Sequence, residues 1–157
     1  MIRSLISLML VLVVVAGCSG KEEKRSAPPA PVGHTAKKES VVVVPKSVQG
    51  KWKAVKVAVT DKETNKESVF TVAIGSSFTI PGTGLAVHLD NFLPDFKMDG
   101  TTLTSQSNNL GNPAAQIRIL DRGSEIFKGW LFARFPTTHA FQHPKYGFTL
   151  VDFVPAR

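Results

Sequence analysis

The stretch KWKAVKVAVT, residues 51–60, decides the fold class because its apolar side chains alternate with a period of two. Val55, Val57 and Val59 fall on one face of an extended chain, and the residues between them fall on the other. The polar residues that follow lead into a second alternating segment, residues 69–74. Together the two segments predict a half-buried β-hairpin.

Further short segments with strand character follow at close spacing, separated by Gly, Pro, Asn and Asp turn signals. They are Leu85–Leu89, Thr101–Thr104, Ala115–Ile119, Ile126–Phe135 and Tyr146–Phe153, with Phe78–Ile80 as a brief addition and Val41–Val44 as a possible edge strand. Pro94 is expected to take the chain out of the sheet. Only Thr137–His143 resembles a helix, where Pro144 would stop a single turn. The pattern predicts an all-β domain over residues 46–157, a small antiparallel β-sandwich or barrel of about seven strands with one short helical turn.

The N-terminus carries the features of an export signal. Met1–Arg3 is positively charged, and Leu5–Val15 is an apolar run too short to span a bilayer comfortably. The four residues ending this region, Val15-Ala16-Gly17-Cys18, resemble the lipobox of bacterial lipoproteins. The resemblance implies a signal peptide over residues 1–17, cleavage between Gly17 and Cys18, a diacylglycerol on the Cys18 sulfur, and acylation of the new amino group by a chain such as palmitate.

The predicted mature chain is therefore anchored to membrane lipid in the cell envelope without spanning the membrane. In Gram-negative lipoproteins an Asp directly after the lipidated Cys tends to mark retention in the inner membrane. This chain has Ser19 there, so it resembles a lipoprotein sorted to the outer membrane and facing the periplasm, if the source is Gram-negative. Residues 19–40 are rich in Pro, Ala, Lys and Glu and lack apolar periodicity, so we expect the lipidated Cys and a disordered linker over residues 18–45.

The net charge of +7 is spread over the chain. Residues 46–157 hold thirteen basic and nine acidic residues, a difference of four. Scattered Lys and Arg favour a solvated basic surface, with attraction to anionic lipid or glycan as the functional alternative. The absence of a basic helix and of an aromatic RNA-binding signature argues against nucleic acid as a partner. Cys18 is the only cysteine, so no internal disulfide is possible.

No catalytic residues are predicted. The sequence holds no G-x-S-x-G nucleophile elbow, and its single cysteine is the predicted lipidation site. Asp95 and Asp99 are a conceivable carboxylate pair of the kind glycosidases use. Aspartates beside Pro and Gly are more often turn formers, so we expect a protein that is not an enzyme.

His139 and His143 have the spacing H-x3-H, which on a helix would place both imidazoles on one side. Two ligands do not make a site, and a third would have to come from His88 or a distant Asp. We predict no metal site and no cofactor, with His139 and His143 as weak candidates for metal ligands.

The densest aromatic segment is FKGWLFARF, residues 127–135. Core packing explains most such segments, and Gly129 before Trp130 suggests a bulge or a close backbone approach. The alternative is a surface that meets a partner or an apolar ligand. The residues assigned to this possible binding surface are Trp130, Phe132, Phe135, His139, His143 and Tyr146.

The residues Gly129–Ala133, Pro136 and His143-Pro144-x-Tyr146 resemble the C-terminal signature of the bacterial domain-of-unknown-function family 2155, which comprises exported envelope proteins. The resemblance covers about Val48–Pro155 and implies a small exported β protein without a known activity. Some members end in a Cys after the last strand, and this chain has none there.

A weaker likeness involves Phe92–Phe96, Asn112–Ala114 and Trp130–Phe132, which are similar to the extracytoplasmic β region of ResB-type cytochrome c maturation proteins. It implies at most an accessory domain of similar fold, and no haem ligand is carried over.

The sequence thus predicts a membrane-anchored envelope lipoprotein with a non-enzymatic binding or structural β module, whose partner is an envelope protein or glycan. The alternative is a carrier of a ligand, metal or haem, accessory to envelope biogenesis such as cytochrome c maturation.

Overall fold

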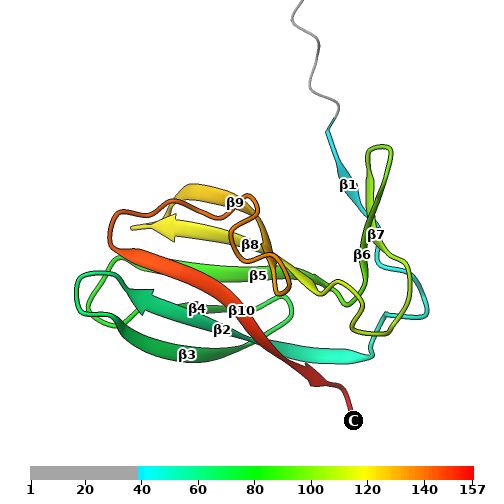
Figure 1. Cartoon of the computed structure of the whole chain (residues 1–157), viewed down its shortest axis with the longest axis horizontal. Coiled ribbons are helices and arrows are strands. Elements are labelled where there is room, and N and C mark those ends of the chain that lie inside the picture. The colour runs from blue at the N-terminus through cyan, green and yellow to red at the C-terminus, as the bar shows by residue number, and fades with distance from the viewer. Residues whose placement is uncertain (1–38) are drawn as a thin grey trace, which may run out of the picture. The chain divides into compact units, whose positions relative to one another are not determined.

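The computed structural model describes residues 39–157, and this part of the chain is all-β, as predicted (Figure 1). Ten strands occur where about seven were expected, because β1, β4 and β6 are very short additions. The strands are β1 Val41–Val42, β2 Trp52–Asp61, β3 Lys66–Ala73, β4 Ser77–Thr79, β5 Leu85–Leu93, β6 Phe96–Asp99, β7 Thr102–Ser105, β8 Ala114–Asp121, β9 Ser124–Phe132 and β10 Tyr146–Pro155.

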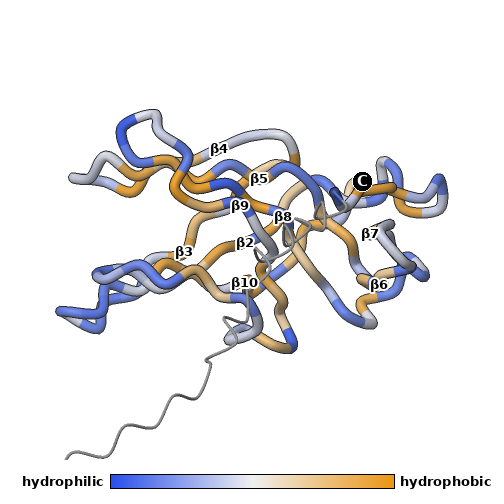
Figure 2. The backbone as a smooth tube through the Cα atoms, turned by 90° about the horizontal axis from the view of Figure 1, so that it is seen from above, coloured by the Kyte–Doolittle hydropathy of each residue, from blue (hydrophilic) through white to orange (hydrophobic). Residues whose placement is uncertain are grey.

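Two antiparallel sheets form a sandwich-like body. One has the strand order β10-β2-β3 and the other β4-β5-β8-β9 (Figure 1). Figure 2 shows the apolar positions concentrated along these strands and the polar ones in the connecting turns. The inward faces supply one core, and burial of this apolar area is the main force that holds the sheets together. Its members include Val55, Val57, Val87, Leu89, Ile117, Ile119, Leu131 and Leu150.

The predicted core faces are confirmed in both sheets, although Ala54 and Ala58 on the opposite face of β2 are buried as well. Val55, Val57 and Val59 on β2 are buried, and β2 pairs with β3 as a hairpin in which Val57 faces Phe70. In β5 a bulge at Asp90 shifts the register between Leu89 and Asn91. Because a bulge adds one residue to a strand of period two, Phe92 points into the core along with Leu89.

A third, smaller sheet has the order β1-β7-β6 and lies at one end of the sandwich (Figure 1). Pro94 follows β5 and takes the chain out of the larger sheet, as predicted. The Ser105 hydroxyl accepts a hydrogen bond from Asp95 N at 2.9 Å and donates one to Ser107 O at 2.8 Å, which fixes this corner. The predicted edge strand exists as β1, and it pairs in parallel with β7.

The helical turn predicted over Thr137–His143 exists only as a hydrogen-bonded turn at Pro136–His139, and residues 39–157 contain no helix. Thr138 N donates to Phe135 O at 3.0 Å, but His139 has φ 51°, a left-handed conformation that ends any helical run.

The predicted signal peptide, the Gly17–Cys18 cleavage site and most of the linker lie outside the described residues. In the described part, residues 39–157, no helix is long and apolar enough to cross a membrane.

Candidate functional site

A groove of about 640 Å³ lies between the outer face of β9 and the hairpin formed by β6 and β7. We call it the β9 groove. Phe96 of β6 packs edge-on against Trp130 and Phe132 of β9, with ring centroids 5.1 and 5.0 Å apart. Met98, which is 59% exposed, extends the apolar wall toward solvent. The other lining residues are Glu39, Ser40, Leu103, Gln116, Phe127, Lys128, Gly129, Thr138 and His139.

Strand register places these aromatic side chains outside the core. On β9, Gly129 and Leu131 lie opposite the core residues Ile117 and Ala115 of β8. Since neighbouring side chains on a strand point to opposite faces, Trp130 projects outward, beside Gln116 of β8. Neither face of β9 is fully covered, and Leu131 is the only buried residue of the strand.

Gly129 is the site of a close approach, as predicted. A side chain at this position would collide with the ring of Phe127, which lies over the glycine. Phe141 packs against the Phe127 ring, with ring centroids 4.8 Å apart. The bulge in β9 lies instead at Ile126, where the register with β8 shifts.

β9 is an edge strand of its sheet. Ala133 N donates to Pro113 O at 3.0 Å, which sets the alternation of backbone groups along the strand. The N–H and C=O groups of Lys128, Trp130 and Phe132 therefore point away from β8. Within residues 39–157 they accept or donate no hydrogen bond beyond the sheet. This edge has no hydrogen-bonding partner among residues 39–157, and it borders the β9 groove.

The residues predicted for a binding surface do not form one site. Trp130, Phe132 and His139 line the β9 groove, but Phe135 is 56% exposed and does not line it. Sequence reasoning missed Phe96 as an apolar wall of this groove, and Met98 altogether. The only available signal was the aromatic run ending at Phe96.

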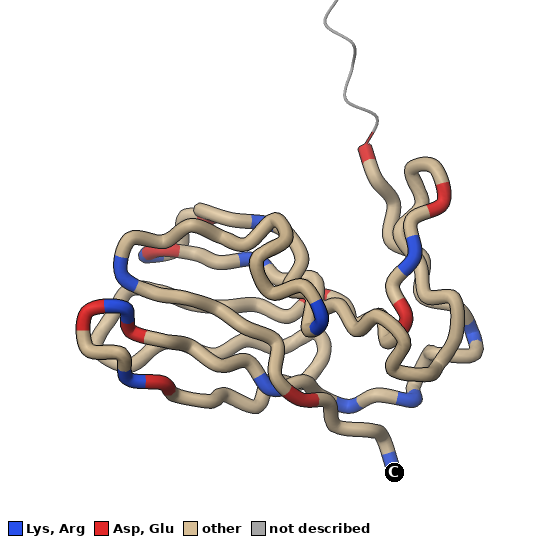
Figure 3. Tube along the Cα trace, in the orientation of Figure 1, with Lys and Arg blue, Asp and Glu red and all other residues tan. Residues whose placement is uncertain are grey.

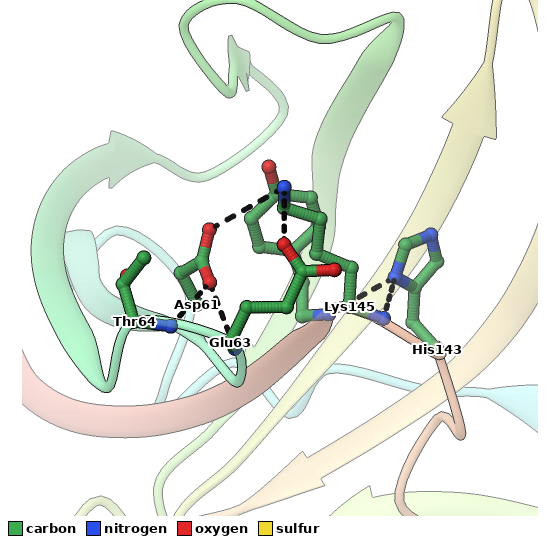
Figure 4. A network of polar contacts seen from close by, with 6 residues as sticks. Asp61, Glu63, Thr64, His143 and Lys145 are labelled. Atoms are coloured by element: carbon green, nitrogen blue, oxygen red, sulfur yellow. Dashed lines mark hydrogen bonds and ion pairs between the residues drawn. The ribbon is translucent and has the colours of Figure 1, made fainter.

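His143 and Tyr146 have a local structural role. His143 Nδ1 accepts hydrogen bonds from Lys145 N at 3.2 Å and Tyr146 N at 3.0 Å, and the His143 and Tyr146 rings stack at 5.4 Å. The imidazole therefore holds the turn that leads into β10 (Figure 4).

The same turn is tied to the β2–β3 hairpin by charged groups (Figure 4). Lys145 Nζ lies 2.8 Å from Glu63 Oε2 and 3.8 Å from Asp61 Oδ2. Glu63 hydrogen-bonds Lys145 and raises its pKa. Asp61 accepts hydrogen bonds from Thr64 N and Glu63 N, and these bonds together with Lys145 lower the pKa of Asp61.

The aspartates considered as a carboxylate pair are separated. Asp95 Oδ2 accepts a hydrogen bond from Ser107 Oγ at 2.9 Å, and its other oxygen lies against Gly111. Asp99 is at the far end of β6 and exposed. Four residues of strand span about 13 Å between these backbone positions. That exceeds the carboxyl separations of about 5–10 Å that glycosidases use.

No metal centre is assembled by the described residues. Among residues 39–157, no three His, Cys, Asp or Glu side chains converge to hold an ion. The helix that would have aligned His139 with His143 is not formed, and His143 Nδ1 already accepts two backbone hydrogen bonds.

Comparisons with known proteins return nothing similar: no protein-family model, no curated protein and no solved structure matches this chain. The resemblances to family 2155 and to ResB-type proteins therefore stay predictions from the sequence.

Proposed function

We propose that this protein is a lipid-anchored envelope lipoprotein whose β domain is a non-enzymatic module that binds an extended segment of a partner protein in the β9 groove. The anchor is the acylated Cys18, at the outer membrane and facing the periplasm if the source is Gram-negative. The observation that carries the proposal is an aromatic groove of about 640 Å³ beside a free strand edge.

An extended segment suits both features. Its backbone pairs with the outward groups of Lys128, Trp130 and Phe132, and its alternate side chains enter the groove. Edge strands without such a role are usually shielded by charge, proline or a covering loop. Along residues 127–132 of β9 the only charged residue is Lys128.

Trp130 is the expected energetic centre of binding. Half-buried aromatic side chains next to adaptable apolar groups such as Met98 are typical anchors of interfaces. Truncation of such an anchor costs about 2 kcal/mol or more, so Trp130→Ala is expected to weaken partner binding roughly thirtyfold.

The test is photo-crosslinking in cells from a photoreactive residue placed at Met98. We expect mass spectrometry of the adduct to identify one extended segment of an envelope protein, and Trp130→Ala to remove it while Trp130→Phe retains it. The matched control is Val69, an exposed apolar residue of β3 that lies away from the groove. Equal crosslinking from both positions, or a glycan as the product, would contradict the proposal. Denaturant unfolding of Trp130→Ala shows whether the domain itself stays folded.

A ligand carrier is the second candidate, including one for haem. It is favoured by His139, which lines the same aromatic groove. Titration of the protein with haem should then give an absorbance change that His139→Ala removes and His143→Ala retains. An unchanged haem spectrum in the wild-type protein eliminates this candidate.

A further inference from the structure

Five cationic residues gather where β2 begins and β10 ends. Residues 45–57 and 153–157 contain no Asp or Glu. Figure 3 shows blue residues following one another along the start of β2, and another at the C-terminus. The five are Lys46, Lys51, Lys53, Lys56 and Arg157. Lys56 is neutralised by Asp152, its partner in the sheet, at 2.8 Å. The other four are exposed and form what we call the basic end.

The fold holds Lys51, Lys53 and Arg157 together. Ala156 N donates to Lys51 O at 2.8 Å, and Pro155 is in register with Trp52, so the tail carrying Arg157 runs beside Lys51 and Lys53. Lys46 belongs to the preceding turn, in which Val48 N and Gln49 N both donate to Pro45 O. Like charges repel one another, and a negatively charged surface opposite them would offset this repulsion.

Apolar groups lie among the charges. Lys53 and Arg157 line a shallow hollow of about 590 Å³ together with Trp52, Val154, Pro155 and Ala156. Pro155 and Ala156 are exposed. Cationic groups beside exposed apolar groups and a half-buried tryptophan match the chemistry of a lipid–water interface.

The residue types also favour a surface over a single small anion. Three of the four free cations are lysines, which act as point charges and lack the two-pronged geometry with which arginine grips one phosphate. None of the four is buried, so no enclosed anion site is formed.

We propose that the basic end is a membrane-contact surface that binds anionic phospholipid headgroups and holds the folded domain against the bilayer. This role goes beyond the acyl anchor at Cys18 and the β9 groove, because it belongs to exposed side chains of the β domain. Each lysine near an anionic surface adds roughly a fivefold factor to the partition coefficient.

The test uses the full chain mixed with vesicles of phosphatidylcholine alone or of phosphatidylcholine with phosphatidylglycerol. Accessible amines are labelled with a water-soluble acylating reagent and measured by mass spectrometry. We expect phosphatidylglycerol to slow the labelling of Lys46, Lys51 and Lys53 severalfold, and high salt to restore it. Lys66 and Lys97 are the internal controls and should label equally on both vesicles.

Two triple variants of equal net charge complete the test. Lys46→Gln/Lys51→Gln/Lys53→Gln should reduce the phosphatidylglycerol-dependent part of co-sedimentation by roughly a hundredfold. Lys66→Gln/Lys97→Gln/Arg134→Gln should reduce it far less. Equal reduction by both variants, or protection that does not depend on phosphatidylglycerol, would overturn the membrane-contact proposal.

The outcomes for the two proposals are separable. Co-sedimentation with phosphatidylcholine alone reports the acyl anchor, whereas the part of the phosphatidylglycerol increment that only the Lys46/Lys51/Lys53 variant loses reports the basic end. Trp130→Ala, which tests the β9 groove, should leave that increment unchanged. Preference for a soluble anionic polymer such as heparin over the vesicles would also overturn the inference.

Discussion

Gly129 shows how one residue shapes the candidate site. The ring of Phe127 occupies the space where a side chain at position 129 would lie, and Phe141 packs against that ring. Trp130, the next residue along β9, points to the opposite face of the strand and lines the groove. The sequence predicts the close approach, since a glycine inside an apolar strand is otherwise unfavourable. It does not reveal which ring makes the contact.

At this position we predict that Gly129→Ala destabilises the domain by about 1–3 kcal/mol, because the held ring of Phe127 must move to make room. Urea unfolding measures the change. The double variant Gly129→Ala/Phe127→Leu should recover part of the loss, since the smaller side chain leaves room for the new methyl group. If the double variant lost the sum of the stabilities lost by the two single variants, the ring of Phe127 would not be the obstacle.

At the scale of elements, alternation predicted the interior of β2, β5 and β8 well, because a one-residue slip would expose a whole apolar face. It could not predict the groove. The groove depends on the corner at Pro94–Asp95, which turns β6 so that Phe96 meets Trp130 and Phe132. The helical turn predicted over Thr137–His143 was wrong because a local contact decides the backbone there. His143 accepts hydrogen bonds from the backbone that follows it, and no helix forms.

The β2–β3 hairpin and the turn before β10 supply a prediction on pH dependence. Hydrogen bonds from Thr64 N and Glu63 N, with the nearby Lys145, lower the pKa of Asp61 in the folded protein. Because the pKa of Asp61 is lower in the folded than in the unfolded protein, its ionised carboxylate stabilises the fold. This stabilisation is fully present at pH values above the unfolded pKa of about 3.9, and it disappears as the pH falls through the folded pKa. Asp61→Ala should therefore be less stable than wild type at neutral pH, with a difference that shrinks below about pH 4.

Urea unfolding midpoints of wild type and Asp61→Ala across this pH range measure the effect. Asp61→Asn is the matched variant, since it keeps an acceptor oxygen for Thr64 N but cannot ionise. Its stability should lack the acid-dependent change contributed by Asp61. A constant difference between wild type and Asp61→Ala down to the lowest pH would contradict this assignment.

At the scale of the whole molecule, the anchor and the folded domain are expected to act independently. The buried apolar residues found within residues 39–157 begin at Val48 and come from the strands and their turns. They build the sandwich core, so we predict that the stability of the domain needs no contribution from Cys18. A change at Cys18 should thus alter where the protein is held and leave the fold intact.

We predict that Cys18→Ser abolishes incorporation of radiolabelled palmitate and releases the protein from the membrane fraction at high salt, where the basic end is screened. The unfolding free energy of the β domain should change by no more than about 0.5 kcal/mol. Ser19→Asp is the informative companion, because it should keep the palmitate label while shifting the protein toward the inner-membrane fraction of a Gram-negative cell. Palmitate label that persists in Cys18→Ser would contradict lipidation at Cys18. Unfolding of the β domain in Cys18→Ser would contradict the independence of the fold from the anchor.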